Sequence, residues 1–248
     1  MLPKFDFNKI KFATDLATFE KAVDLYESGK VKNFKEGVGS YSAIIEGGKN
    51  YNVSVEARRF GLGYCDCYMG QNDYLCKHMV ALSIYALLGG KPITPEDKKL
   101  NSEPQCFGKL GELSKAELAE VKKSISYAIK YIKSYNGPSR TWFAYQASLS
   151  EGCNRLSAIV SGLLVSAQTA ELVVKMLLRL DKKLCAGVDD SDGTVGGFIQ
   201  ECVEVLKEFA QYDKKCINVF GLLCNQPTCF DWEYPLALMY DENKENKS

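Results

Sequence analysis

The spacing of hydrophobic residues divides the chain into an N-terminal part that mixes two periodicities and a C-terminal part that shows only the helical one. Between residues 14 and 27 apolar positions recur every three or four residues, which predicts an amphipathic helix. Strand-like segments follow at 31–35, 40–46 and 51–57, with a glycine-containing hairpin turn at 47–50. Apolar and polar residues alternate in the third segment, as expected of an antiparallel strand with one buried face.

A second group of elements is expected from residue 60 onward. A short strand runs from Phe60 into Cys67, and the apolar sequence after Cys76 predicts a helix closed by two glycines at 89–90. Residues 91–111 are polar and contain three prolines, so this segment is the best linker candidate. The helices predicted beyond it are 114–136, 142–150, 154–165, 169–184, 197–212 and 213–223, followed by a frayed polar tail after Tyr240.

These patterns predict two domains of different class. The first, residues 1–110, is expected to be α+β, with a small antiparallel sheet plus helices. The second, residues 111–248, is expected to be an all-α helical domain. The 248 residues are 46% hydrophobic and 25% charged, which is typical of an ordinary globular protein of this size.

The charge balance narrows the classes of function. Lys and Arg number 31, and Asp and Glu also number 31, so the formal net charge is zero. A dedicated nucleic-acid binder usually has a basic surplus, so this balance favours a protein partner slightly and leaves room for a local basic patch.

The composition also predicts a compartment. No run approaches the ~18 consecutive apolar residues of a membrane-spanning helix, and no secretory leader is recognisable. We therefore expect a cytoplasmic, reducing environment and no membrane contact. In that setting the ten cysteines are expected to be thiols or metal ligands rather than disulfides.

One cysteine-rich segment has the spacing of a metal site. It reads Cys65-x-Cys67, eight residues, then Cys76-x-His78. Two cysteines at positions i and i+2 of an extended segment point to the same side, and the second pair repeats that spacing at the start of the next helix. Zinc prefers four thiolate or imidazole ligands in a tetrahedron, so we predict that these four residues bind one zinc ion. Four protein ligands leave no position for water, which makes the predicted zinc structural rather than catalytic.

This arrangement resembles the SWIM zinc finger, whose pattern is Cys-x-Cys, a variable loop and Cys-x-His. The resemblance covers about residues 14–90, including the hairpin at 41–55 and the apolar start of the next helix; beyond Gly111 nothing is recognised. It implies an element that binds DNA or protein, often beside chromatin-remodelling helicases, transposases or recombination factors. The chain contains no such catalytic domain, so the expected role is that of an adaptor in a DNA-processing setting.

Three cations near the predicted zinc site are candidates for nucleic-acid binding. Arg58 and Arg59 directly precede the zinc strand, and Lys77 lies between the last two ligands. Together they could contact phosphate. The alternative is that they are simply solvated side chains at the end of a strand. Three thiolates and one zinc ion add a charge of about −1, so phosphate binding is expected to be modest and sensitive to salt.

The sequence does not indicate an enzyme or a nucleotide cofactor. Its only histidine is a predicted zinc ligand, and phosphate-binding and dinucleotide-binding motifs are absent. One alternative is an unrecognised enzyme in the helical domain, with the acidic residues 189–192 as its site, although these fit a helix-capping loop better. Another alternative is a self-association domain that pairs apolar helices such as 172–180.

The remaining cysteines suggest little further chemistry. Cys216, Cys224 and Cys229 are spaced by eight and five residues with no histidine nearby, so a second metal is a weak possibility that the sequence leaves open. Cys106, Cys153 and Cys185 are expected to be isolated thiols.

Overall fold

The structure is a computed structural model that describes residues 3–138 and 142–246. The chain forms two compact units, Met1–Leu100 and Asn101–Ser248, and each unit has its own hydrophobic core. An α+β unit is followed by a helical one, which confirms the predicted fold classes.

The boundary between the units lies at Leu100, inside the predicted linker rather than at residue 110. The reason is that the residues after it pack on the second unit. Ser157 Oγ donates to the Ser102 carbonyl at 3.2 Å, and the Gln105 amide donates to Ser161 Oγ at 3.0 Å.

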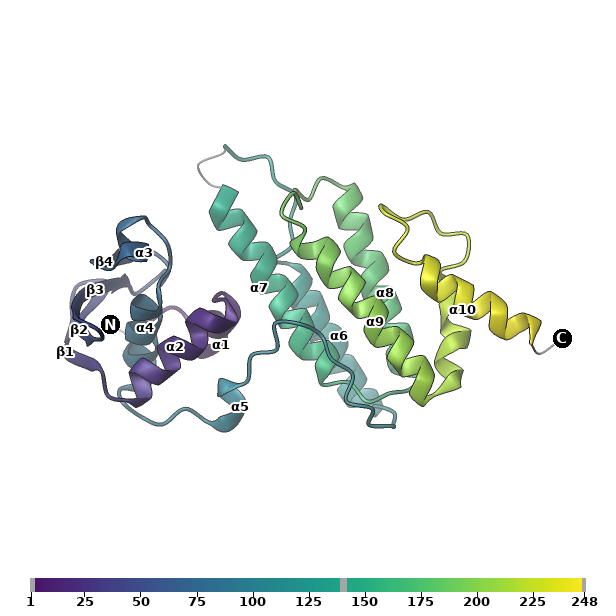
Figure 1. The fold of residues 1–248 in the computed structure, drawn as a ribbon, viewed down its shortest axis with the longest axis horizontal. Helices are drawn as coiled ribbons and strands as arrows, with labels where there is room; N and C mark the ends of the chain where they lie inside the picture. Colours follow the sequence, from purple (N-terminus) through teal and green to yellow (C-terminus); the bar gives the residue numbers. More distant parts are fainter. Residues whose placement is uncertain (1–2, 139–141, 247–248) are drawn as a thin grey trace. The chain divides into compact units, whose positions relative to one another are not determined.

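The first unit is built around a four-stranded antiparallel sheet in the order β1-β2-β3-β4. Its helix α4 packs against β2 and β3 on one face of the sheet, and α2 packs against α4 (Figure 1). The strands are β1 (Val31–Glu36), β2 (Ser40–Glu46), β3 (Asn50–Glu56) and β4 (Gly63–Cys65). The helices are α1 (Phe7–Phe12), α2 (Leu16–Glu27), α3 (Tyr68–Gln71), α4 (Lys77–Leu88) and α5 (Pro95–Lys98).

The two faces of the sheet differ in character because side chains alternate along each strand. On β2, Tyr41, Ala43 and Ile45 are buried in the core, whereas Ser42 and Ile44 between them are only half-buried. Residues paired across antiparallel strands share a face, so the β3 partners Ser54 and Asn52 lie with Ser42 and Ile44 on the face opposite α4.

An irregularity in β1 adds two lysines to that open face. The pairing of β1 with β2 shifts between Lys32 and Lys35, and Asn33 there has a positive φ of 51°. As a result Lys32 pairs with Ile44 and Lys35 pairs with Ser42, both of which lie on the open face. Phe34 between them turns inward, where its ring stacks on Tyr41 at a centroid distance of 5.9 Å.

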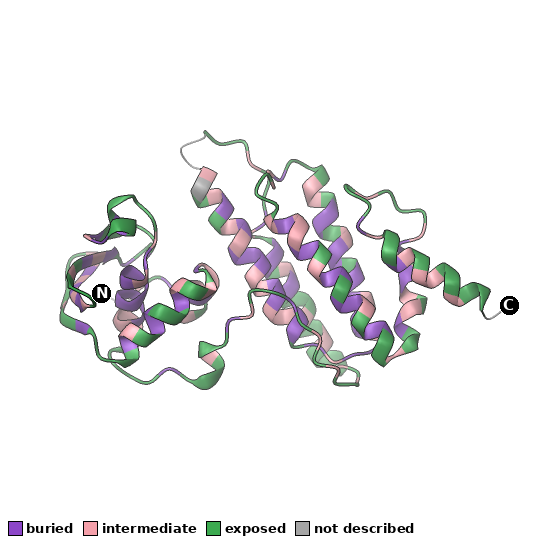
Figure 2. Ribbon diagram, in the orientation of Figure 1, coloured by how far each residue is buried: buried purple, intermediate pink, exposed green. Residues whose placement is uncertain are grey.

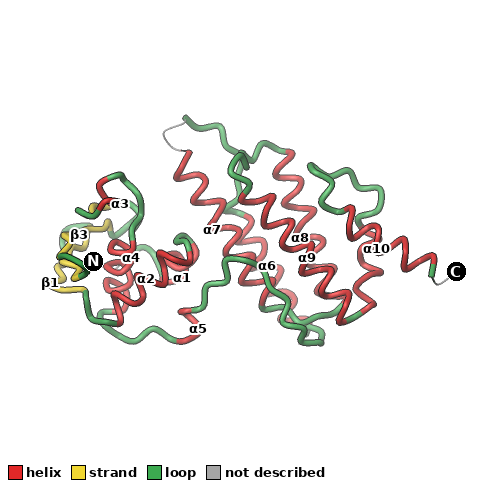
Figure 3. The backbone as a smooth tube through the Cα atoms, in the orientation of Figure 1, coloured by secondary structure: helices red, strands yellow, loops and turns green. Residues whose placement is uncertain are grey.

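The second unit consists of helices and connecting loops (Figure 3). The buried sides of its long helices meet in one apolar core (Figure 2). Within the described residues, no helix is long and apolar enough to span a membrane. The helices are α6 (Lys115–Ile129), α7 (Trp142–Ser161), α8 (Ala167–Cys185), α9 (Thr194–Tyr212), the 3-10 helix η2 (Lys214–Leu222) and α10 (Tyr234–Glu245).

The largest differences from the predicted helices are in α7, α6 and α10. The helix α7 is continuous where two helices were predicted. Its Gly152 lies close to Ile132, since a Cβ at Gly152 would lie 2.8 Å from Ile132 Cγ1. The helix α6 ends at Ile129 rather than near residue 136, and α10 continues to Glu245 where fraying was predicted after Tyr240.

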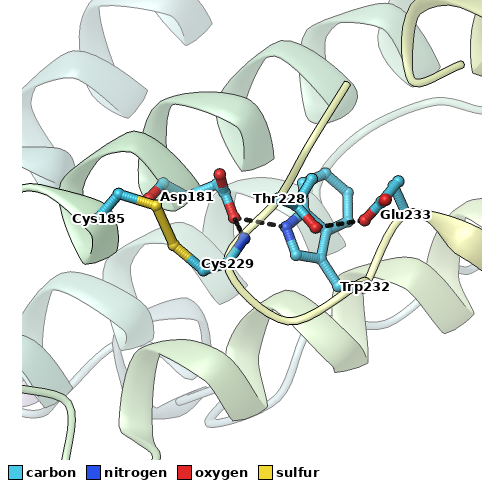
Figure 4. The surroundings of a disulfide bond; sticks show 6 residues. All are labelled: Asp181, Cys185, Thr228, Cys229, Trp232 and Glu233. Atoms are coloured by element: carbon cyan, nitrogen blue, oxygen red, sulfur yellow. Dashed lines mark hydrogen bonds between the residues drawn. A yellow bond between two sulfur atoms is a disulfide. The ribbon is translucent and has the colours of Figure 1, made fainter. Parts of the chain in front are cut away.

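Cys185, predicted to be an isolated thiol, instead forms a disulfide with Cys229 (Figure 4). Cys185 ends α8, and Cys229 lies in the loop between η2 and α10. One turn before Cys185, the buried Asp181 accepts hydrogen bonds from the Cys229 amide and from Trp232 Nε1, both at 2.9 Å. The loop is therefore attached to α8 by a covalent bond and by a buried carboxylate. The prediction that the cysteines are only thiols or ligands is wrong for this pair, and Cys229 is not available to a second metal site with Cys216 and Cys224.

We predict that Cys229→Ser lowers the free energy of unfolding of the second unit. The disulfide closes a loop with a sequence separation of 44. By chain entropy such a loop is worth about 4 kcal/mol. Denaturant unfolding followed by tryptophan fluorescence measures this selectively, because Trp142 and Trp232 are the only tryptophans and both lie in this unit.

The matched control is Cys224→Ser, which alters a half-buried thiol outside the disulfide. Added reductant should shift the wild-type protein and leave Cys229→Ser unchanged. Equal unfolding curves for wild type with and without reductant would contradict the expectation.

Candidate metal centre

Three short elements bring the predicted zinc ligands together. Cys65 ends β4, Cys67 is the N-cap of α3, Cys76 is the N-cap of α4, and His78 is the second residue of α4. All four side chains are buried, with between 0% and 8% of each residue exposed. Three thiols and an imidazole converging in the interior are expected of a closed metal site.

The distances between the ligand atoms fit one zinc ion. All four atoms lie within 4.8 Å of one another. His78 Nδ1 is 3.6 Å from Cys65 Sγ and 3.9 Å from Cys76 Sγ. Tetrahedral zinc, with Zn–S about 2.3 Å and Zn–N about 2.0 Å, places sulfur and nitrogen about 3.6 Å apart. The residues present therefore fit one structural zinc ion, as the sequence predicted, and the structure adds that the histidine faces the site through Nδ1.

Comparison with known protein families agrees with this geometry. Residues 51–87 match the SWIM zinc finger. The matched part, the SWIM segment, spans β3, β4, α3 and nearly all of α4, and contains the four ligands. This confirms the resemblance noted from the sequence. No curated protein and no solved structure is significantly similar to the chain.

The SWIM segment stabilises negative charge on its thiols through helix N-termini. Cys67 Sγ accepts a hydrogen bond from the Gly70 amide at 3.3 Å, and Cys76 precedes the 12-residue helix α4. The positive end of a helix dipole favours a thiolate at such a position. The hydrogen bond with Cys65 lowers the pKa of Cys76 to about 4, and the same bond, together with burial, raises the pKa of Cys65. Zinc binding requires the thiolate form, so it displaces the remaining thiol protons.

Neighbouring side chains orient the ligands. The ring of Tyr51 on β3 stacks on the His78 imidazole with the ring centroids 4.2 Å apart. Asp66, between the first two ligands, accepts hydrogen bonds from Asn52 through the backbone amide at 3.2 Å and through Nδ2 at 3.0 Å. The backbone hydrogen bond from Asn52 is also the main reason that the pKa of Asp66 is lowered. These contacts fasten the zinc-binding loop to β3. Sequence reasoning missed both, because nothing in the spacing of Tyr51 or Asn52 indicates them.

The structure places the three predicted nucleic-acid residues at two different positions. Arg58 and Arg59 are exposed in the turn between β3 and β4, whereas Lys77 is the half-buried first residue of α4. Within the described chain, none of the three side chains forms a hydrogen bond or an ion pair with another residue. Their role in binding stays a prediction.

The acidic residues 189–192 form a helix-capping loop, as the simpler interpretation predicted. The Asp190 carboxylate accepts hydrogen bonds from the Val195 and Gly196 amides, at 2.7 and 2.8 Å, in the first turn of α9. Asp192 accepts one from the Thr194 amide at 3.2 Å. These contacts give the carboxylates a structural task at the start of α9.

We predict that Cys76→Ser abolishes stoichiometric zinc binding. Wild type should carry one zinc ion per chain after dialysis, and the variant close to none, because a serine hydroxyl is not a zinc ligand at neutral pH. Zinc content by atomic emission measures this. Chelation at neutral pH should remove zinc from wild type in the same way and unfold the sheet, without changing the tryptophan fluorescence of the second unit. Acid should also release the zinc, because the thiolates must be deprotonated to bind it.

Cys106→Ser, a change in the second unit, is the control and should keep its zinc. A sheet that keeps its circular dichroism after zinc is removed would show that the metal does not stabilise this unit.

We further predict that Gly70→Ala weakens zinc binding. A Cβ at this position would lie 2.4 Å from the Cys65 carbonyl oxygen and 2.5 Å from Cys65 Cβ, so the ligand itself must move. Overpacking of this kind costs about 1–3 kcal/mol, which corresponds to a roughly 5- to 150-fold loss of affinity. Competition with a chromophoric chelator measures the change. Gly61→Ala is the matched control, since a Cβ there meets no atom within 4 Å. Equal affinities of the two variants would contradict the steric argument.

Proposed function

We propose that this chain is a zinc-stabilised adaptor whose SWIM segment recognises nucleic acid or protein beside DNA-processing machinery. The observation that carries the proposal is the buried, four-ligand site within the SWIM match. A site with no open coordination position supplies rigidity rather than chemistry. Rigidity suits a recognition surface, because a preorganised surface loses less conformational entropy on binding.

Two features support a non-enzymatic role. The only histidine is a zinc ligand, which leaves no histidine as a general base. The acidic cluster that would be the first place to seek a catalytic site serves instead to cap α9. The helical unit is then best interpreted as a second interface of the adaptor.

Self-association through α8, the alternative suggested by the apolar pattern at 172–180, has little support. The apolar residues that could have paired between two chains lie inside the core of their own unit: Leu172, Val173, Met176, Leu177 and Leu180 are all at least nine-tenths buried. They are therefore not available to a second copy.

The proposal is tested by fluorescence anisotropy of labelled single- and double-stranded DNA with the zinc-loaded chain over a salt series. We expect binding that weakens with salt and is lost in Cys76→Ser, since the recognition surface depends on zinc. Absence of binding at low salt, with zinc confirmed, would leave protein as the ligand of the SWIM segment. Equal binding by wild type and Cys76→Ser would show that the SWIM segment is not the binding element.

A further inference from the structure

The sheet face opposite α4 is uncovered and hollow. A shallow cavity of about 620 Å³ lies on it and is lined by residues of all four strands. Its polar lining includes Asn33, Lys35, Ser42, Asn52, Ser54 and Tyr64. Among the lining residues there is one cation and no carboxylate. The other face of the same sheet is filled by the core, so this face is the one the sheet offers to a ligand.

The strand register arranges these side chains in a row. Lys35 pairs with Ser42, Ser42 with Ser54, and Ser54 with Tyr64, so the row crosses the sheet from β1 to β4. Lys32 pairs with Ile44 in the next row and adds a second ammonium group at the β1 edge. One edge of the face is thus cationic, the opposite edge is aromatic, and hydroxyl groups lie between them.

We propose that this surface binds single-stranded nucleic acid. We call it the sheet platform and define it as Lys32, Lys35, Ser42, Ser54 and Tyr64. A base stacks on Tyr64, which is 54% exposed, while phosphates contact the two lysines. The serine hydroxyls donate to or accept from the sugar and the base edges. The inference rests on the proposed function and specifies its ligand.

The dimensions of the platform favour a single strand over a duplex. Three strand spacings of about 4.8 Å separate Tyr64 from Lys35, or about 14 Å in total. This length holds at most about four nucleotides, the number for a stacked strand with a rise of about 3.4 Å, and fewer when the bases are splayed. In a duplex the faces of the bases are stacked on one another and cannot reach Tyr64, whereas an unpaired strand can splay its bases onto an open sheet. The small side chains of Ser42 and Ser54 let the nucleic-acid strand approach the sheet closely.

The charge of the platform sets the expected salt dependence. For single strands the logarithm of the binding constant falls with the logarithm of the salt concentration with a slope of about −0.7 per phosphate contact. Two lysines should therefore contribute about −1.4 to the slope. This figure separates the platform from Arg58, Arg59 and Lys77, whose contributions would remain after both platform lysines are removed.

The experiment measures anisotropy of a short labelled single strand and of its duplex with the zinc-loaded full chain. We expect Tyr64→Ala to weaken single-strand binding by roughly 5- to 150-fold, the value of one stacked base. The double variant Lys32→Ala/Lys35→Ala should weaken binding and make the salt slope shallower by about 1.4. All these side chains are exposed at the surface, so each variant should keep one zinc ion per chain and unchanged tryptophan fluorescence.

Matched controls are Lys21→Ala/Lys99→Ala, which removes two exposed lysines outside the sheet, and Tyr234→Ala, which removes a tyrosine 65% exposed on α10. Both should bind like wild type. Wild-type binding that survives in the platform variants would overturn this inference and leave the proposed function standing. Preference for the duplex would overturn the single-strand assignment. Absence of any nucleic-acid binding would overturn the inference together with the nucleic-acid arm of the proposed function, and protein would then be the ligand.

Discussion

Zinc coordination is the constraint on which the first unit depends. The strand β4 has three residues and α3 has four, and elements this short are not stable without tertiary support. The four ligands connect β4, α3 and α4 at the metal site, and the stacking of Tyr51 on His78 connects this site to β3. Since residues alternate along β4, turning Cys65 toward the metal turns Tyr64 to the opposite face. The metal thus orients an exposed aromatic residue that it does not touch.

The second unit is stabilised by a disulfide and a hydrophobic core rather than by a metal ion. The two units are therefore expected to respond to different changes in conditions. Its core is mainly apolar, and the loop before its final helix is attached to α8 through Asp181 and the disulfide. Cys185 and Cys229 are exposed, so a thiolate reagent can reach them. The zinc cysteines are buried and, once bound to metal, shielded from oxidation. One chain can therefore carry three reduced thiolates and one disulfide together, and metal removal and thiol reduction act on different units.

The sequence was informative where the signal comes from residues close together in the chain. It failed where a feature depends on residues that are distant in the sequence and meet only in the folded structure. Long helices and the hairpin follow from periodicity, and the zinc site follows from ligand types at fixed spacing. The helices α1, α3 and α5 contain six residues or fewer, too short for a period to register. The disulfide joins residues separated by 44 positions, so no local sequence pattern predicts it. The open face was equally invisible, because a single irregularity in β1 decides that Lys32 and Lys35 lie on the same side of the sheet.

The neutral charge of the chain limits what a nucleic-acid surface on the sheet can achieve alone. Two lysines and one stacked base supply only a few kcal/mol, and salt reduces part of that. Weak binding of this kind becomes effective when a second module of the same chain engages a partner nearby, because the linked site then acts at a high effective concentration. An adaptor has this organisation by definition. In the proposed adaptor the helical unit, which has its own core, makes the second contact, so weak binding by the SWIM segment agrees with the proposed role.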